Sequence, residues 1–404
     1  MKKFPLHLQI IVSIVLAIIF GIFLPNQVRL IDWMGNIFLR ALKMIVVPLV
    51  FASLVSGVTH IGSEGNLGRL GLKTLLYYFS TSLIAIITGL ILVNIFHPGA
   101  GAEPLVNIPN ENLNLEPKPV METLIEIVPT NIFEALTGGN MLSIILFALL
   151  FGIFITRIKT DYRSHLETFF TAVFEVMMKI TLFIIRFAPL GIFAIVAGVV
   201  AETADLTELA LRLGKFMLVV ILGLAIHSGL TLPLILKFIG KLNPLKHFRS
   251  VRTALLTAFS TASSNATLPL TLEEIEENAG VSNKISSFTL PLGATINMDG
   301  TALYELVVVG FVAQLYGIEL SIGQQLVVVL TALLSSIGTA GVPMASYVTM
   351  SIIFTAVGLP FEAIALILPI DRPLDMLRTC VNVLGDTVGA ATIASSEGET
   401  LKIK

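Results

Sequence analysis

The sequence predicts an all-α protein that crosses a membrane several times. Of its 404 residues, 55% are hydrophobic and only 13% are charged, and the mean hydropathy is +0.91. A soluble domain carries about a quarter charged residues, so this chain has too few to cover a core in water. Several apolar stretches also reach the roughly 20 residues that a helix needs to span a bilayer. The natural solvent for most of the surface is therefore lipid.

The same composition excludes other classes of protein. The net charge is −2 and no long basic or acidic block occurs, so nothing predicts nucleic-acid binding. A single cysteine, Cys380, excludes an intramolecular disulfide framework and a cysteine metal cluster. The six histidines show no metal-ligand spacing, and no nucleophile–base pair stands out. The chain is therefore not expected to be an enzyme.

The apolar stretches define the expected spans in chain order. The first lies behind Lys2 and Lys3 and lacks a small-residue cleavage site, so we interpret it as an uncleaved span rather than a signal peptide. The fifth is too long for one straight helix, and Pro189 with Gly191 is expected to break or tilt it. The six stretches are Leu6–Leu24, Gly35–Val58, Leu70–Phe96, Met141–Ile158, Leu166–Val200 and Leu209–Phe238.

Charges in the loops predict the orientation of the chain. Basic residues gather at two of the connections, whereas the loop 98–118 contains several glutamates against one lysine. Because basic loops stay on the cytoplasmic side, we expect the N-terminus in the cytoplasm and this loop outside. The basic residues are Arg157, Lys159, Arg163, Lys237, Lys241, Lys246, Arg249 and Arg252.

From about Pro244 the apolar pattern is interrupted by small polar residues in two similar sets. Each set has a Ser/Thr-rich segment ending in proline (260–269 and 335–343) and then an Asn/Asp/Gly/Thr cluster (297–301 and 382–387). Both clusters are expected to be unwound, which a bilayer tolerates only where protein buries the backbone or a cavity solvates it. Matching interruptions in two halves predict a transporter binding site. The alternative is an accidental likeness between polar turns.

The segment 369–390 carries several charges in an otherwise apolar sequence, and each charge near the bilayer centre costs about 2.5–3.5 kcal/mol. Intervals of four, three, four and four residues place the polar set on one helical stripe roughly 80° wide, with Arg372 off it. One interpretation is a structural ladder of ion pairs between two helices. The functional one is a cavity wall that binds a carboxylate, an ammonium group or cations. The stripe consists of Asp371, Asp375, Arg378, Asn382 and Asp386.

The cluster Asn297–Thr301 favours a local break in a helix, and Asp299 adds a carboxylate there. Sodium coordination by carbonyl and carboxylate oxygens is the expected use, with a simple kink as the alternative. Glu305 follows about one turn later, where a buried carboxyl group could carry a proton. Hydroxyl groups at near-helical spacing in the third span are a weaker signal, since such groups often bond the preceding turn: Tyr78, Thr81 and Ser82.

At these residues the sequence resembles the glutamate transporter family, the dicarboxylate/amino acid:cation symporters. The resemblance extends over nearly the whole chain. An archaeal member of that family is an established example of a transporter built from inverted repeats. Four motifs in family order carry the resemblance: Ser263–Pro269, Asn297–Thr301, Gly338–Pro343 and Asp375–Asp386.

The resemblance implies eight transmembrane helices, two re-entrant helical hairpins and a homotrimer in which each transport domain moves like an elevator against a fixed scaffold. The first hairpin would span Asn243–Asn278, with its tip at Ser263–Asn265. The second would span Ile322–Leu359, with a gating tip at Gly338–Pro343. The implied division is 1–69 for scaffold helices 1 and 2, 70–97 for helix 3 of the transport domain, 98–200 for the external loop and scaffold helices 4 and 5, 201–242 for helix 6 of the transport domain, and 243–404 for the hairpins with helices 7 and 8.

The family's substrate-binding roles carry over by motif. The resemblance implies that Arg378 binds a side-chain carboxylate and that Asp375 binds the amino group. Thr379 and Asn382 would bind the main-chain carboxylate. Because a guanidinium fork matches a carboxylate and Asp375 favours an α-amino group, aspartate or glutamate is the expected cargo. Neutral amino acids and C4-dicarboxylates are the alternatives for a carrier, and a channel is the alternative of another class. Further substrate contacts are implied at Ser263, Ser264, Asn265, Thr301, Gly341 and Val342.

The resemblance also implies three sites for sodium, the transported coupling ion. The first would use Gly293, Asn297, Asn382 and Asp386. The second would use Thr295 and Met298 with backbone of Ser336, Ile337 and Thr339. The third would use Tyr78, Thr81, Ser82, Asn297 and Asp299. All these positions hold the residue type that the family motif requires.

Several positions depart from the family pattern. A supporting arginine is common at the first hairpin tip or just after the substrate-binding aspartate, but these positions hold Ala262 and Met376. The nearest extra arginine is Arg372. Asn265 stands where a third serine is common, and Met344–Ser346 stands where some prokaryotic members have glycines.

Glu305 matches members that co-transport protons, whereas sodium-only archaeal members have glutamine at this position. Sodium ligands and a candidate proton carrier thus occur together in one sequence. We therefore expect sodium coupling, with a proton as a candidate second ion. A carrier coupled to protons alone is the alternative. The expected surroundings are the lipid bilayer of a cell membrane.

Overall fold

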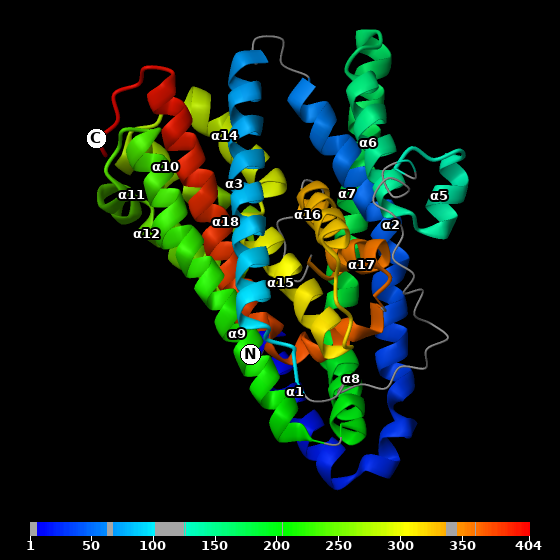
Figure 1. The fold of residues 1–404 in the computed structure, drawn as a ribbon. Helices are drawn as coiled ribbons and strands as arrows, with labels where there is room; N and C mark the ends of the chain where they lie inside the picture. The colour runs from blue at the N-terminus through cyan, green and yellow to red at the C-terminus, as the bar shows by residue number, and fades with distance from the viewer. Residues whose placement is uncertain are drawn as a thin grey trace, which may run out of the picture.

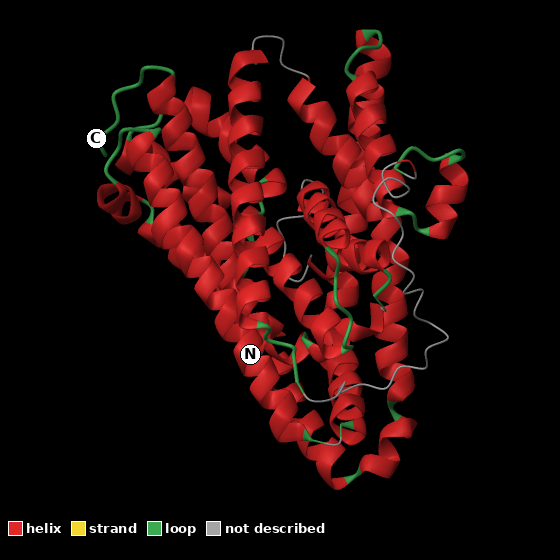
Figure 2. Cartoon of the chain, viewed as in Figure 1, coloured by secondary structure: helices red, strands yellow, loops and turns green. Residues whose placement is uncertain are grey.

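The computed structural model describes residues 6–62, 68–101, 125, 127–203, 205–336, 346–359 and 361–404. Within these ranges the chain forms helices joined by turns, and no strand occurs (Figure 2). The predicted all-α class is therefore confirmed. Five helical segments of the described part are long and apolar enough to cross a membrane: Asp32–Thr59, Arg69–Phe96, Thr160–Ile185, Leu206–Phe238 and Asn283–Leu315.

The first half of the chain forms helices close to the predicted apolar spans (Figure 1). The long fifth stretch is divided as predicted, because α7 ends at Ile185 and α8 begins at Ala188 with Pro189 in its first turn. Proline fits there, since the first turn of a helix needs no N–H donor. The elements are α1 (Leu6–Phe23), η1 (Pro25–Leu30), α2 (Asp32–Gly62), α3 (Gly68–Phe96), α5 (Ile132–Gly138), α6 (Met141–Ile155), α7 (Thr160–Ile185), α8 (Ala188–Glu202), α9 (Leu206–Ile226), η3 (His227–Thr231) and α10 (Leu232–Phe238).

The second half contains two pairs of short helices that pack against each other, α12 with α13 and α16 with α17. They alternate with longer helices. The elements are α11 (Pro244–Ser250), α12 (Arg252–Thr261), α13 (Ser264–Glu274), η4 (Ile275–Ala279), α14 (Asn283–Ile296), α15 (Asp299–Leu315), α16 (Ile322–Ser336), α17 (Ser346–Val357), η5 (Phe361–Leu366) and α18 (Leu368–Ser396).

The turn between α12 and α13 coincides with the predicted tip of the first hairpin. Ala262 ends α12 in the left-handed region, with φ of 50°. Ser263 then caps α13, because its hydroxyl accepts a hydrogen bond from the Ala266 N–H at 3.2 Å. The predicted tip of the second hairpin, Gly338–Pro343, lies outside the described residues.

One of the two expected unwound clusters is present. The chain leaves helical geometry at Asn297 and Met298, between α14 and α15, as predicted. The prediction is wrong for the second cluster, because α18 is an unbroken helix across Asn382 and Asp386. These two residues lie one turn apart on the same face, so their side chains reach the α14–α15 break without any unwinding of their own helix.

The core of the molecule is centred on α15, which is apolar and buried along nearly its whole length. It contacts α3, α9, α16, α17 and α18, and in Figure 1 it runs through the middle of the bundle. A helix that is buried all round must be apolar all round, and α15 follows this rule except at a few polar positions. Those exceptions, Asp299, Thr301 and Glu305, are therefore candidates for function.

A second group of helices packs beside this core. α1 lies against α8, and α2 contacts α6, α7 and α8. Phenylalanine rings fill part of this group: Phe51 lies 6.1 Å from Phe147 and 6.0 Å from Phe170, measured between ring centroids. α17 and η5 supply contacts between the two groups.

The close packing of α3 on α15 generates a test of the fold. A Cβ atom on Gly89 would lie 2.9 Å from the Leu303 carbonyl oxygen, whereas one on Gly214 of α9 would meet no atom within 4 Å. We expect Gly89→Ala to lower the free energy of unfolding by roughly 1–3 kcal/mol through overpacking. Gly214→Ala should be neutral or stabilising by up to about 1 kcal/mol. Thermal unfolding of the purified protein in detergent measures both, and equal melting temperatures would contradict this packing.

Candidate functional site

The predicted polar stripe lies along α18 and faces the protein interior. Each of its five residues is at most 7% exposed: Asp371, Asp375, Arg378, Asn382 and Asp386. Charges buried in this way require compensating partners, because neither lipid nor an apolar core solvates them. The structure supplies those partners at two places along the stripe.

The first place is an ion-pair cluster in the first half of α18. Arg378 Nη2 lies 3.0 Å from Asp371 Oδ1 and 2.9 Å from Asp375 Oδ1. Arg372, predicted to lie off the stripe, reaches back to Asp375, with 3.0 Å between its Nη1 and Oδ2. Tyr304 of α15 donates to Asp371 at 2.6 Å and places its ring 3.7 Å from the Arg378 guanidinium carbon. Two carboxylates thus offset two guanidinium groups.

These contacts bear on the proposed ladder of ion pairs between two helices. The three ion pairs all join residues of α18 itself, so they do not tie α18 to another helix. The arrangement instead holds a buried guanidinium and a carboxylate side by side on one helix face. A guanidinium fork recognises a carboxylate, and a carboxylate recognises an ammonium group.

The second place is the break between α14 and α15. Asn297 donates from Nδ2 to Asp386 Oδ1 at 2.8 Å. Asn382 accepts from the Gly300 N–H at 2.8 Å, and its own Nδ2 contacts Thr301 Oγ1 at 3.1 Å and Met298 Sδ at 3.2 Å. Side chains of α18 therefore satisfy polar groups that the interrupted helix leaves open.

Hydroxyl groups of α3 complete this polar centre. Asp299 Oδ1 accepts from Ser82 at 2.6 Å and from Thr81 at 3.3 Å. Thr81 also lies 3.4 Å from Asn297 Oδ1. Tyr78 donates to the Thr289 carbonyl oxygen of α14 at 2.8 Å. The three hydroxyls that were a weak signal in the sequence are thus gathered around the break.

Glycine allows the elements to approach this closely. A Cβ on Gly293 would lie 2.4 Å from Asp386 Oδ1 and 2.6 Å from the Tyr78 hydroxyl. One on Gly300 would lie 2.7 Å from the Arg378 carbonyl oxygen. A larger residue at either position would push α18 away from the break.

The remaining predicted site residues make fewer contacts with these two places. Ser263 and Ser264 are buried at the α12–α13 turn, whereas Asn265 is exposed. Thr295 and Thr379 hydrogen-bond to carbonyls of their own helices at 3.0 and 2.8 Å. Ile337, Thr339, Gly341 and Val342 lie outside the described residues, as does the side chain of Ser336.

The chemistry of the polar centre suits an alkali cation. Amide, hydroxyl and carboxylate oxygens from α3, the α14–α15 break, α15 and α18 lie close together there, and broken helices supply such ligands to sodium in transporters. Among the described residues, no group of three or more His, Cys, Asp or Glu side chains is placed to hold a metal ion. The oxygens present are thus chiefly neutral groups beside one or two carboxylates.

Comparison with known proteins decides the family. The family model of sodium:dicarboxylate symporters matches residues 6–396. The chain belongs to this symporter family. It is similar to the proton/glutamate-aspartate symporter of Escherichia coli (37% identity over 98% of this chain and 93% of the relative). It is similar to the proton/sodium-glutamate symport protein of Geobacillus stearothermophilus, with 37% identity over 99% of this chain and 96% of the relative. It is also similar to excitatory amino acid transporter 2 of Homo sapiens, with 37% identity over 93% of this chain and 75% of the relative.

Membership of this family confirms the resemblance seen in the sequence motifs. The protein is a membrane transporter, and it is not an enzyme. The family's symport activity couples a solute to cations, in keeping with the cation and carboxylate chemistry of the described centre.

Glu305 of this symporter lies on α15 and is fully buried. The Thr349 hydroxyl of α17 donates to its Oε1, and the Ser335 hydroxyl of α16 also interacts with the carboxyl group. The contact with Thr349 also joins α15 to one arm of the second predicted hairpin.

Three residues that contact the predicted site residues were not predicted from the sequence. His227 contacts Asp299, Tyr304 contacts Asp371, and Thr349 contacts Glu305. The only sign of them in the sequence was that each is a polar residue, a histidine, a tyrosine or a threonine, within a long apolar stretch. That signal indicates a buried polar partner but does not say which one.

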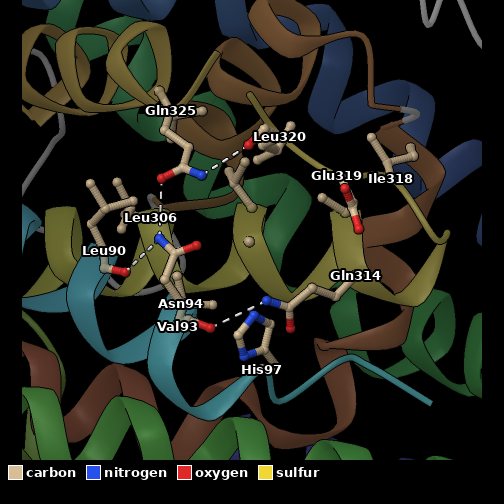
Figure 3. Close-up of a pocket in the computed structure, with 14 residues that line it drawn as sticks. Leu90, Val93, Asn94, His97, Leu306, Gln314, Ile318, Glu319, Leu320 and Gln325 are labelled. Atoms are coloured by element: carbon tan, nitrogen blue, oxygen red, sulfur yellow. Dashed lines mark hydrogen bonds between the residues drawn. The ribbon is translucent and has the colours of Figure 1, made fainter. Parts of the chain in front are cut away.

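A cavity of about 260 Å³ lies away from this centre, between the ends of α3 and α15 and the start of α16 (Figure 3). Its walls combine aliphatic side chains with amides. Asn94 donates to Gln325 Oε1 at 3.1 Å, and Gln314 donates to the Val93 carbonyl oxygen at 3.2 Å. None of the predicted substrate or sodium residues lines it.

Proposed function

We propose that this symporter carries L-aspartate or L-glutamate, driven by a sodium gradient and with a proton as a second coupling ion. The observation that carries the proposal is the buried pair of Arg378 and Asp375, 2.9 Å apart on one face of α18. A guanidinium recognises the side-chain carboxylate of such a substrate, and a carboxylate recognises its ammonium group. The names of the relatives from Escherichia coli and Geobacillus stearothermophilus support this choice.

Substrate binding exchanges partners within the α18 cluster. The incoming carboxylate takes a place on the Arg378 guanidinium that Asp375 occupies in the described structure. Arg372 keeps hold of Asp375 Oδ2, which leaves Oδ1 for the substrate ammonium. Thr379 and Asn382, one helical turn further along, bind the main-chain carboxylate. The implied contacts from the hairpin tips and Thr301 complete the site: Ser263, Ser264, Asn265, Gly341 and Val342.

Sodium binds at the implied sites around the α14–α15 break. The first site takes Gly293, Asn297, Asn382 and Asp386, and the third takes Asp299 with Asn297 and the hydroxyls of α3. Support comes from their proximity, since Asn297 contacts both Asp386 and Thr81. The second site takes Thr295 and Met298 with backbone of Ser336, Ile337 and Thr339.

The proposed architecture follows the family. It has eight spans, two re-entrant hairpins, a cytoplasmic N-terminus and a homotrimer whose transport domains move as elevators. The packing of α12 on α13 and of α16 on α17 supports the hairpins. The proposed transport domain comprises 70–97, 201–242 and 243–404, and the scaffold comprises 1–69 and 98–200.

The first test is uptake of labelled L-aspartate by proteoliposomes. We expect concentrative uptake under an inward sodium gradient and strong competition by unlabelled glutamate but not by serine or succinate. Arg378→Met should weaken aspartate binding about 100-fold, since it removes roughly 3 kcal/mol of charge-assisted contacts. Competition by serine or succinate would favour a neutral or dicarboxylate carrier. Flux without any concentrative phase would indicate a channel.

A second test concerns Glu305 as the proton carrier. In the wild-type protein, an inward proton gradient added to the sodium gradient should increase the rate of uptake. Glu305→Gln removes the titratable group and should abolish this increase while keeping sodium-driven uptake. The exposed Glu319, substituted to glutamine, is the matched control and should retain the wild-type response. If Glu305→Gln leaves the pH dependence of uptake unchanged, protons enter by another group.

A third test concerns Arg372. Without it, Asp375 can turn both oxygens toward Arg378 and compete with the substrate carboxylate for the guanidinium. We expect Arg372→Ala to raise the KM for aspartate about tenfold, the equivalent of roughly 1.4 kcal/mol, with little change in kcat. Arg372→Lys should recover part of the loss, because it restores the charge without the fork. An unchanged KM in both variants would show that Arg372 has no part in substrate binding.

A further inference from the structure

His227 lies at the polar centre although no sequence motif points to it. Its side chain is fully buried, and its Nε2 atom is 3.0 Å from Asp299 Oδ2, which is buried as well. α9 and η3 bring the histidine to this position from outside the α3–α15–α18 group that supplies the other contacts.

A widened turn of helix presents His227 to Asp299. The segment His227–Thr231 is a π-helical turn between α9 and α10, in which the Leu232 N–H donates to the His227 carbonyl oxygen. Pro233 follows in the first turn of α10 and has no N–H to donate. Such π turns are local departures from α geometry that occur frequently at functional sites.

The surroundings of the imidazole define its hydrogen-bonding role. His227 Nδ1 is buried and has no hydrogen-bond partner among the described residues. A proton on Nδ1 would therefore be an unsatisfied donor in an apolar interior, which costs free energy. The neutral tautomer with its proton on Nε2 avoids this cost and donates to Asp299 Oδ2.

The two oxygens of Asp299 consequently have different partners. Oδ2 accepts from His227, whereas Oδ1 faces the hydroxyls of Ser82 and Thr81. A hydrogen bond to one oxygen restricts rotation of the carboxylate about its Cβ–Cγ bond. Outer partners of this kind orient metal ligands, and their loss typically lowers metal affinity about 10–100-fold.

We propose that His227 is a positioning residue for sodium. It holds Asp299 Oδ2 so that Oδ1 stays directed at the cation site formed with the α3 hydroxyls and Asn297. The inference rests on the proposed sodium coupling. It adds a residue, His227, that contacts the proposed sodium ligand Asp299 rather than the sodium ion itself.

The test compares variants that keep the ring volume or keep the donor. His227→Phe keeps an aromatic ring but has no N–H, whereas His227→Gln keeps an N–H near the position of Nε2. Sodium affinity is read in two ways: from the rise in melting temperature of the purified protein with sodium concentration, and from the sodium concentration for half-maximal aspartate uptake.

We expect His227→Phe to raise the half-maximal sodium concentration at least tenfold in both measurements. The maximal rate of uptake at saturating sodium should stay within about twofold of wild type, and His227→Gln should recover most of the sodium affinity. A wild-type sodium titration in His227→Phe, or an equal loss in both variants, would overturn the proposal.

His247 offers a matched control. It is also fully buried, has one hydrogen bond from Nε2, to Thr387 Oγ1 at 3.1 Å, and leaves Nδ1 without a described partner. Its partner is a hydroxyl rather than a proposed sodium ligand. His247→Phe should change the melting temperature without changing the sodium titration. A tenfold sodium shift in this control would attribute the effect to general loosening and overturn the assignment.

A double-mutant cycle with Asp299 remains decisive if His227→Phe is poorly folded. His227→Gln and His227→Asn are compared in the wild-type and Asp299→Asn backgrounds. Differences in sodium-dependent stabilisation between the two His227 variants should vanish when Asp299 is replaced, and their persistence would overturn the proposal. Wild-type protein that shows neither sodium stabilisation nor sodium-dependent uptake would instead contradict the proposed function.

Discussion

The break at Asn297 and Met298 depends on side chains that other helices bring to it. In an apolar interior an open backbone group must find a partner, and here the Asn382 side chain of α18 accepts from the Gly300 N–H. Asp386 of the same helix accepts from the side chain of Asn297. α18 must therefore pack against α14 and α15 in a register that places Asn382 and Asp386 opposite the break. The same requirement explains the close approach at Gly293, where no side chain fits. An interrupted helix that is buried in the protein thus determines the packing of its neighbours.

Charge compensation imposes a second constraint on the same helix. Two arginines and two aspartates compensate one another's charge within little more than two turns of α18: Asp371, Arg372, Asp375 and Arg378. The ring of Tyr304 covers the guanidinium of Arg378. A balanced cluster of this kind is tolerated in a buried position, and it contains Arg378 and Asp375, the two residues proposed to bind the substrate. Under the proposed function, the groups that compensate one another's charge in the fold are also those that recognise the substrate.

Local chemistry made parts of the structure predictable. Pro189 indicated the boundary between α7 and α8, and Asn297 with Gly300 indicated the break, because these residues act on their own backbone. The expected unwinding at Asn382 was wrong for the opposite reason. Whether an amide interrupts its own helix or reaches across to another depends on what lies opposite, and a single segment does not contain that information. Arg372 lies off the stripe, as its spacing predicted, but the spacing did not predict that its long side chain reaches Asp375.

By itself, the sequence determined that the chain is a helical membrane protein, where most apolar spans lie and which polar residues interrupt them, since hydropathy and turn chemistry are local properties. Its motifs also predicted the family that the comparisons show. Only the tertiary structure decided which polar groups meet. Ser82 and His227 lie far apart in the chain, yet each contacts a different oxygen of the Asp299 carboxylate. Such pairings follow from helix packing, because a buried polar group takes whichever partner the neighbouring helices place within reach.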